Sequence, residues 1–264
     1  MPKTKKLKKP QKPVVRSPRW YGWQPDLPDH RDFLYAAIKP KGVRLPRSKD
    51  LRQGCSPIED QEALGSCTAN ALVGALEFLE LKAGAPFTDL SRLFVYYNER
   101  VIEATVDVDS GAYLRDGIKT LAKQGVCTEE SWPYVISDFT NEPTAACYQE
   151  AVGHVISDYH RLNTVDEMRA CLNEGFPFVF GFSVYAAFES KAVEKSGVLD
   201  LPDYSREAFK GGHAVLAVGY DDDEERFWVR NSWGKKWGQD GYFSMPYDYL
   251  ADRNLSDDFW TVRK

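Results

Sequence analysis

The stretch QEALGSC, from Gln61 to Cys67, leads from a turn-like region into the first clear helical pattern of the chain. A flexible residue, Gly65, and a residue that favours helix N-caps, Ser66, come directly before the cysteine. Beyond it, apolar residues recur with the spacing of an amphipathic helix: Ala71, Leu72, Ala75, Leu76 and Leu79. We therefore expect Cys67 to stand in the first turn of a helix.

A cysteine in that place is chemically distinctive, because the unpaired N–H groups and the dipole of a helix N-terminus stabilise a thiolate. Taken alone, Cys67 is more simply interpreted as a buried thiol that packs like a small hydrophobic residue. A catalytic interpretation needs a base and a group that orients this base.

Among the four histidines, His213 stands out because two glycines, Gly211 and Gly212, precede it and leave open space beside its ring. A strand-like run, 214–220, follows and would hold the imidazole rigidly. The alternative is an ordinary histidine at the end of a strand. His154 and His160 are six residues apart, roughly 20 Å along a strand, and are too distant to share one metal ion.

Asn231 follows another strand-like run, 227–230, and its side-chain carbonyl can accept the second imidazole N–H. Its alternative role is that of a turn residue. Two tryptophans, Trp233 and Trp237, can shield that hydrogen bond from water or simply fill the core. Together the residues provide a nucleophile, a base and an orienting group in the order Cys, His, Asn, which favours catalysis over the separate alternatives.

The first half of the body is rich in helical patterns and the second half in strands. Further helices are expected at 91–100, at 114–124 before Gly125, and after the capping box that begins at Thr164. The strand-like runs are 178–184, 214–220, 227–230 and 241–245, with an acidic turn, 221–225, joining two of them. The pattern predicts an α+β protein with a cleft between a helical lobe and a sheet lobe.

Charge divides the chain of 264 residues unevenly: residues 1–25 hold eight Lys or Arg and no acid, whereas the whole chain has a net charge of −5. A cationic tail can contact nucleic acid or an anionic membrane, but such blocks more often stay solvated or lie on an acidic body. We therefore expect no nucleic-acid partner. The chain contains no apolar run long enough to cross a membrane and no apolar stretch behind its basic N-terminus. Residence in the cytoplasm, or export by a route that needs no signal peptide, is the expectation.

The chain has five cysteines, so at least one is unpaired, which suits a reactive thiol. The sequence contains no C-x-x-C pair, so we expect no structural zinc site.

Three segments in order resemble the papain family of cysteine peptidases. The first runs from Gln61 to Cys67, the second is the GHAV sequence at 212–215, and the third is NSWG at 231–234 followed by WG at 237–238 and GYF at 241–243. Weaker matches are LS at 90–91 and EESWPY at 129–134. The likeness spans residues 50–264 and extends to a bacterial member of the family.

The resemblance implies a papain-like two-lobed fold, with a helical lobe, an antiparallel barrel-like β lobe and the active-site cleft between them. It implies a thiol endopeptidase that needs no metal or organic cofactor and acts on polypeptides. Cys67 would be the nucleophile and His213 its acid/base partner, and the two would form a thiolate–imidazolium pair that hydrolyses peptide bonds through an acyl-enzyme. Asn231 would be the orienting residue and Gln61 an oxyanion donor. Substrate would bind along Ser110, Gly111, Tyr113, Gly212 and Trp233, with 249–252 as the floor of a side-chain pocket.

Departures from the family pattern are Leu64, where a cysteine is usual, and Thr68, where a tryptophan is usual. Family disulfides are therefore not carried over, although Cys127 and Cys147 are a possible local pair.

The expected organisation is a basic, proline-rich extension at 1–49, a helical lobe at 50–150 and a β-rich lobe at 151–264, in a monomer. Aromatic and proline residues at 21–28 suggest an extended segment without a core of its own. The hypothesis is that 21–27 covers part of the cleft and restrains activity, like a pro-segment; the alternative is a structural strap. Two rival functions are an acyltransferase that uses the same Cys-His-Asn group and a peptide-binding module without catalysis.

Overall fold

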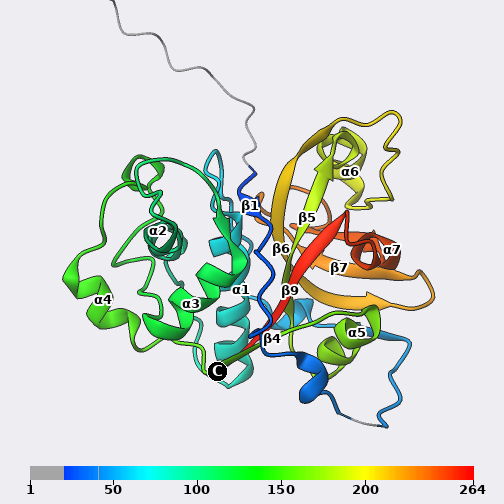
Figure 1. Cartoon of the computed structure of the whole chain (residues 1–264), viewed down its shortest axis with the longest axis horizontal. Coiled ribbons are helices and arrows are strands. Elements are labelled where there is room, and N and C mark those ends of the chain that lie inside the picture. Colours follow the sequence, from blue (N-terminus) through cyan, green and yellow to red (C-terminus); the bar gives the residue numbers. More distant parts are fainter. Residues whose placement is uncertain (1–20, 41) are drawn as a thin grey trace, which may run out of the picture.

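The computed structural model describes residues 21–40 and 42–264, so the expectation for the basic N-terminal residues falls largely outside the described part. Figure 1 shows the helices of the first half of the chain on one side and a twisted sheet, with the shorter helices of the second half around it, on the other; an extended segment runs between them. This α+β, two-lobed arrangement confirms the fold expected from the sequence. Within the described residues, no helix is long and apolar enough to cross a membrane.

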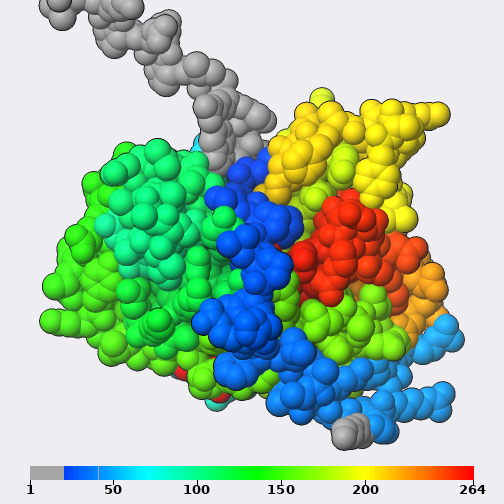
Figure 2. All heavy atoms as spheres, in the orientation of Figure 1, coloured from blue at the N-terminus to red at the C-terminus, as the bar shows by residue number. Residues whose placement is uncertain are grey.

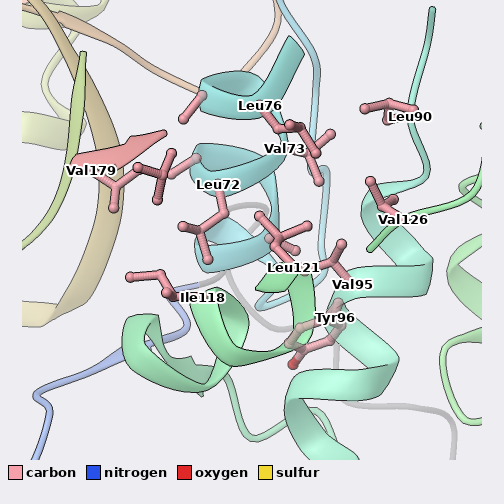
Figure 3. Close-up of a cluster of buried hydrophobic side chains, with 14 of the residues drawn as sticks. Leu72, Val73, Leu76, Leu90, Val95, Tyr96, Ile118, Leu121, Val126 and Val179 are labelled. Carbon is pink, nitrogen blue, oxygen red and sulfur yellow. The ribbon is translucent and has the colours of Figure 1, made fainter. Parts of the chain in front are cut away.

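The helical lobe is built around α1, Cys67–Lys82, which starts at the cysteine as predicted. Its other helices are α2 (Arg92–Glu103), α3 (Leu114–Lys123) and α4 (Ala145–Ala151), with short 3-10 turns at Arg52–Gly54 and Ile136–Asp138. Side chains from α1, α2 and α3 meet in one apolar core, where Leu72, Leu76 and Leu121 pack together (Figure 3). Because α1 is buried along almost its whole length, its N-terminal cysteine is held rigidly.

The sheet lobe has the strand order β4-β9-β5-β6-β7-β8, antiparallel throughout, and β2 pairs with β6 outside this path. The strands are β2 (Ser48–Asp50), β4 (Asp158–Arg161), β5 (Phe178–Tyr185), β6 (Phe209–Asp221), β7 (Arg226–Arg230), β8 (Tyr242–Pro246) and β9 (Ser256–Arg263). The helical segments of this lobe are α5 (Val165–Asn173), α6 (Lys191–Ser196), α7 (Tyr247–Ala251) and 3-10 turns at Tyr35–Ala37 and Ala186–Glu189. The four predicted strands are present, and the sequence analysis missed β9, which lies between β4 and β5.

The segment from Tyr21 to Leu27 lies along the boundary between the lobes. Its strand β1, Trp23–Gln24, pairs in parallel with β3, Ala112–Tyr113, on the helical side. In Figure 2 the blue atoms of this segment fill the seam between the green helical lobe and the red and yellow parts of the sheet lobe. Residues that the sequence analysis assigned to a separate extension thus pair with both lobes: β1 pairs with β3 of the helical lobe, and β2 pairs with β6 of the sheet.

Candidate active site

The residue before the helix, Ser66, is the N-cap residue, as the sequence predicted. It holds the N-cap position without a capping hydrogen bond. Its hydroxyl instead lies 2.5 Å from the hydroxyl of Tyr134 and accepts from Asn70 Nδ2 at 3.1 Å. No Ser66 side-chain bond therefore caps the first N–H groups of α1, and the N–H of Thr68 contacts the Cys67 sulfur, where it would stabilise a negative charge.

Cys67 is completely buried at that seam. Its Sγ accepts a hydrogen bond from the backbone N–H of Ala214, which belongs to the opposite lobe, at 3.4 Å. Burial raises the pKa of the thiol to about 11, while the backbone N–H groups of Ala214, Gly22 and Thr68 lower it. Burial is thus the largest influence on the thiol, and the backbone N–H groups around it oppose that influence.

His213 immediately precedes Ala214 on β6, so the strand that contacts the thiol also carries the imidazole. Nε2 of His213 lies 2.8 Å from Oδ1 of Asn231, and since an amide oxygen only accepts, the ring donates. The same Oδ1 accepts the backbone N–H of Ser232 at 2.9 Å, which fixes the amide orientation. Trp233 stacks on the imidazole with ring centroids 5.0 Å apart and an angle of 27°. These contacts bring His213, Asn231 and Trp233 together.

Gln61 is also completely buried beside this group. Its Oε1 accepts from the hydroxyl of Ser232 at 2.5 Å, and its Nε2 donates to the carbonyl of Leu64 at 2.9 Å. The backbone N–H of Gln61 donates to the carbonyl of Ser232 at 2.9 Å. The side-chain amide is therefore held rigidly between the nucleophile loop and the loop after Asn231.

The five residues expected to bind substrate all face the segment from Tyr21 to Leu27. The carbonyl of Ser110 accepts from Gln24 Nε2 at 2.9 Å, and Tyr113 pairs with Gln24 in the β1–β3 ladder. A Cβ on Gly111 would lie 2.0 Å from the Gly22 carbonyl oxygen, and one on Gly212 would lie 2.5 Å from the Trp23 carbonyl oxygen. The ring of Trp233 lies 6.1 Å from that of Tyr21. The expected substrate surface is thus occupied by the chain's own segment.

Sequence reasoning missed two buried acidic features near this surface. Asp258 and Asp26 hold the segment through indole and backbone N–H donors, and Glu99 lies beneath the nucleophile. A buried carboxylate needs donors that come from elements distant in the sequence, so spacing alone contained no signal for them. The aromatic residues at 21–23 gave the only hint.

All five cysteines are free thiols, so the possible Cys127–Cys147 disulfide is not formed in this structure. The two sulfurs are neighbours, and the nearby Cys147 raises the pKa of Cys127, after the larger effect of burial. Within residues 21–40 and 42–264, no cluster of three or more His, Cys, Asp or Glu side chains is arranged to hold a metal ion.

Comparison with known proteins places this geometry in context. The model of a family described as papain family cysteine protease matches residues 45–256. An uncharacterised peptidase-like protein of Acanthamoeba polyphaga mimivirus is 42% identical over 93% of this chain and 87% of its own length. Cysteine proteinase 2 of Zea mays is 28% identical over 79% of this chain, which spans 57% of the maize protein.

Among solved structures, xylellain, a cysteine protease from Xylella fastidiosa, superposes with a TM-score of 0.87 and 42% identity. That match covers 95% of this chain and 99% of xylellain.

Proposed function

Because the chain belongs to the papain family of cysteine proteases, we propose that it is an endopeptidase with Cys67 as nucleophile and His213 as acid and base. Asn231 orients the imidazole, and an N–H of the Gln61 side chain stabilises the oxyanion. The observation that carries the proposal is the meeting of two lobes at one sulfur. There, Sγ of Cys67 lies 3.4 Å from the backbone nitrogen of Ala214, the residue after His213. Nε2 of His213 lies 2.8 Å from Oδ1 of Asn231.

In the first half of the reaction, His213 takes the thiol proton and the Cys67 sulfur attacks the peptide carbonyl carbon. The carbonyl oxygen becomes an oxyanion that the Cys67 backbone N–H and the Gln61 side-chain amide stabilise. As the C–N bond breaks, the imidazolium gives its proton to the leaving amine, and a thioester remains on Cys67.

In the second half, His213 removes a proton from a water molecule, which attacks the thioester carbon. The C–S bond breaks, the acid product leaves, and the thiol regains its proton. The Nε2–H of His213 donates to Asn231 throughout, so the other ring nitrogen carries the transferred proton. No step requires a metal ion or an organic cofactor.

Endopeptidase action is supported by the path of the segment from Tyr21 to Leu27. In Figure 1 it enters the seam between the lobes at one end and leaves at the other. A seam that accommodates a continuous chain in this way can accept the middle of a polypeptide substrate. We assign the helical lobe, 50–150, to carrying the nucleophile and the β-rich lobe, 151–264, to carrying His213 and Asn231, in a monomer.

We further propose that the extension, 1–49, restrains the enzyme through the segment from Tyr21 to Leu27. The backbone N–H of Gly22 contacts the thiol of Cys67, which is completely buried, so the segment lies across the nucleophile. The ring of Tyr21 packs edge-on against His213 with centroids 6.0 Å apart, and its hydroxyl donates to Glu189 at 2.8 Å. Substrate and segment therefore compete for the same surface.

The orientation of Gly22 explains how a segment can cross the nucleophile without being an efficient substrate. Its carbonyl oxygen accepts from the Ala112 N–H at 2.7 Å, and is therefore directed at β3. The group of Gly22 that faces the thiol is its N–H, which is not an electrophile. Attack by the sulfur on the Gly22 carbonyl would first require that hydrogen bond to break.

A thiol-directed peptidyl epoxide tests the catalytic assignment. It should modify Cys67 alone and abolish cleavage of a peptide library, and Cys67→Ala should cleave nothing. Product analysis with an added amine distinguishes hydrolysis from acyl transfer, since a transferase would yield mainly the amide. Cleavage by Cys67→Ala equal to that of the unaltered chain would refute the assignment.

A further inference from the structure

The side chain of Trp23 fills a pocket one residue away from the point where the segment crosses Cys67. The indole lies against the backbone of β5 and β6, because a Cβ on Gly181 would be 1.8 Å from Trp23 Cε2 and one on Gly212 would be 2.7 Å from Trp23 Cε3. Ala112 is its strand neighbour on the helical side. Only two glycines in these positions leave a flat slot of this depth, and Trp23 is 8% exposed in it.

A carboxyl group lies beside the N–H of the Trp23 indole. Asp258, on β9, is completely buried, and its Oδ2 accepts the indole N–H of Trp23 at 3.1 Å and the backbone N–H of Asp26 at 2.8 Å. Its Oδ1 accepts from Arg161 Nη2 at 2.9 Å. Asp258 therefore closes the end of the slot that holds the indole N–H of Trp23.

The backbone of β9 is distorted so as to aim this carboxyl into the slot. The pairing of β5 with β9 shifts register between Val179 and Gly181, and Asp258 has a φ of 57°, in the left-handed region. An aspartate in this conformation costs free energy that a regular strand residue would not cost. Bulges beside active sites commonly redirect a side chain, and here the redirected group is the one that meets the indole.

Departure of the segment would remove both donors of Oδ2 at once, since Trp23 and Asp26 belong to the same stretch of chain. Arg161 would stay on Oδ1 because it comes from β4 of the body. A buried carboxylate oxygen without a donor costs free energy. A ligand that brings an N–H to this oxygen should therefore bind more tightly than a ligand of equal shape without one.

A second cation is not the favoured ligand for this pocket. Asp258 is already paired with Arg161, which also contacts Asp257 at 3.0 Å and Asp32 at 3.2 Å. A lysine or arginine inserted into the slot would meet that guanidinium as a like charge. A neutral, planar group with one N–H donor fits both the slot and the carboxyl at its end.

We propose that Asp258 is a specificity-determining residue and that the pocket selects substrates with a tryptophan side chain. This inference rests on the proposed function, since it concerns the substrate of the same site. Trp23 would then compete with a substrate tryptophan for the slot, because both would make the same contacts in it.

The test uses the full chain with Gly22→Ala, because a Cβ on Gly22 would lie 1.8 Å from the Gly65 carbonyl oxygen and should dislodge the segment. Fluorogenic peptides would differ only in the second residue before the cut: Trp, benzothienylalanine, Phe or Arg. Benzothienylalanine keeps the shape of tryptophan and lacks the N–H. We expect kcat/KM for Trp to exceed that for the isostere by roughly tenfold or more, with Phe and Arg lower still.

Asp258→Asn adds a second comparison on the same background. Its carbonyl oxygen would stay on Arg161 and turn the NH2 toward the slot, so the preference for Trp over the isostere should fall to about one. Asp257→Asn is the matched control, since Asp257 also binds Arg161, whereas the acceptor of the Trp23 indole N–H is Asp258. It should keep the preference.

Equal kcat/KM for Trp and its isostere would overturn the proposal, as would a preference unchanged by Asp258→Asn. Binding of the same peptides to the double variant Gly22→Ala, Cys67→Ala, measured by calorimetry, gives this comparison without turnover. If no peptide is cleaved and the epoxide leaves Cys67 unmodified, the proposed function fails, whereas the binding comparison still decides the pocket.

Discussion

The hydroxyl of Thr68 donates to the carboxyl of Glu99 at 2.8 Å, and both side chains are completely buried directly behind the nucleophile. Thr68 is the residue that departs from the family pattern at this position, and Glu99 comes from α2. Burial raises the pKa of Glu99 well above its ordinary value, so this carboxyl is held in its neutral form. The pair replaces aromatic packing with a polar contact inside the helical core.

Thr68→Val should lower the free energy of unfolding by about 1–2 kcal/mol, because it leaves the Glu99 carboxyl without its hydroxyl donor.

Glu99→Gln should change how the free energy of unfolding depends on pH. With a raised pKa in the folded state, Glu99 favours folding below its ordinary pKa of about 4.3, and that contribution is lost as pH rises through the folded pKa. Glutamine does not titrate, so the loss should vanish; urea unfolding between pH 4 and pH 9 would measure it. Parallel profiles for both chains would contradict the neutral assignment.

Gly22→Ala should raise the turnover of small peptides and the rate at which an epoxide modifies Cys67, because the added methyl group cannot fit against Gly65. Gly153→Ala is the matched control, since its Cβ would have its nearest neighbour at 3.4 Å. Steady-state hydrolysis of one fluorogenic peptide suffices as the measurement. If Gly22→Ala remains folded and turns over no faster than Gly153→Ala, the segment is a structural strap only.

The segment from Tyr21 to Leu27 should bind the rest of the protein more tightly at acidic pH. Asp26 and Asp258 lie close together, and burial together with their mutual repulsion raises the pKa of Asp258 to about 7; burial also raises that of Asp26. Charged neighbours that face the pair are Arg115, Arg161, Asp32 and Asp257. Released Asp26 would return to its ordinary pKa of about 4, so docking takes up protons between about pH 4 and pH 7 and weakens as pH rises through that range.

The measurement for this effect is the ratio of kcat/KM in the unaltered chain to that in Gly22→Ala at each pH, in which titration of the catalytic groups cancels. The ratio should rise from pH 4 to pH 8. Asp26→Asn keeps an acceptor for the indole of Trp260 but does not titrate, so its ratio should be flatter. A ratio that falls with pH would show the opposite linkage.

Gln61→Glu isolates the oxyanion contribution. Glutamate preserves the acceptor for the Ser232 hydroxyl and removes the N–H donors, so kcat should fall by about 10²–10³. Comparing KM and kcat on the Gly22→Ala background separates this from a binding defect, because KM should change little. If kcat is unaltered, the Gln61 side chain does not stabilise the oxyanion and another donor must do so.

Asn231→Ala removes the acceptor of the His213 Nε2–H and should lower kcat by roughly tenfold or more. Lys235→Ala, on an exposed position of the following loop, serves as the control for local disturbance. The pH profile of kcat is the decisive measurement, since an imidazole released from its acceptor would titrate differently. Identical profiles would mean that Asn231 is only a turn residue.

Local sequence signals were sufficient for much of this molecule. Amphipathic spacing after Cys67 located α1, the capping box at Thr164 located α5, and the strand-like runs located β5 to β8. These succeeded because each element satisfies its own hydrogen bonds and turns one face to the core. Ser66 holds the predicted N-cap position, but its hydroxyl contacts Tyr134, 68 residues away, in place of a capping N–H, and no local pattern reveals that contact.

The sequence alone determined that a thiol would begin a helix, that a histidine would adjoin a strand and that an asparagine would directly follow another strand, since those are properties of short stretches. Only the tertiary structure decided that Ala214 would contact that thiol, that Gly22 would cover it, and that Asp258 would end the pocket of Trp23. Such contacts join residues up to 235 positions apart. They are selected by the packing of two lobes as a whole, because burial of a charge or a thiol is set by every element around it and not by its neighbours in the chain.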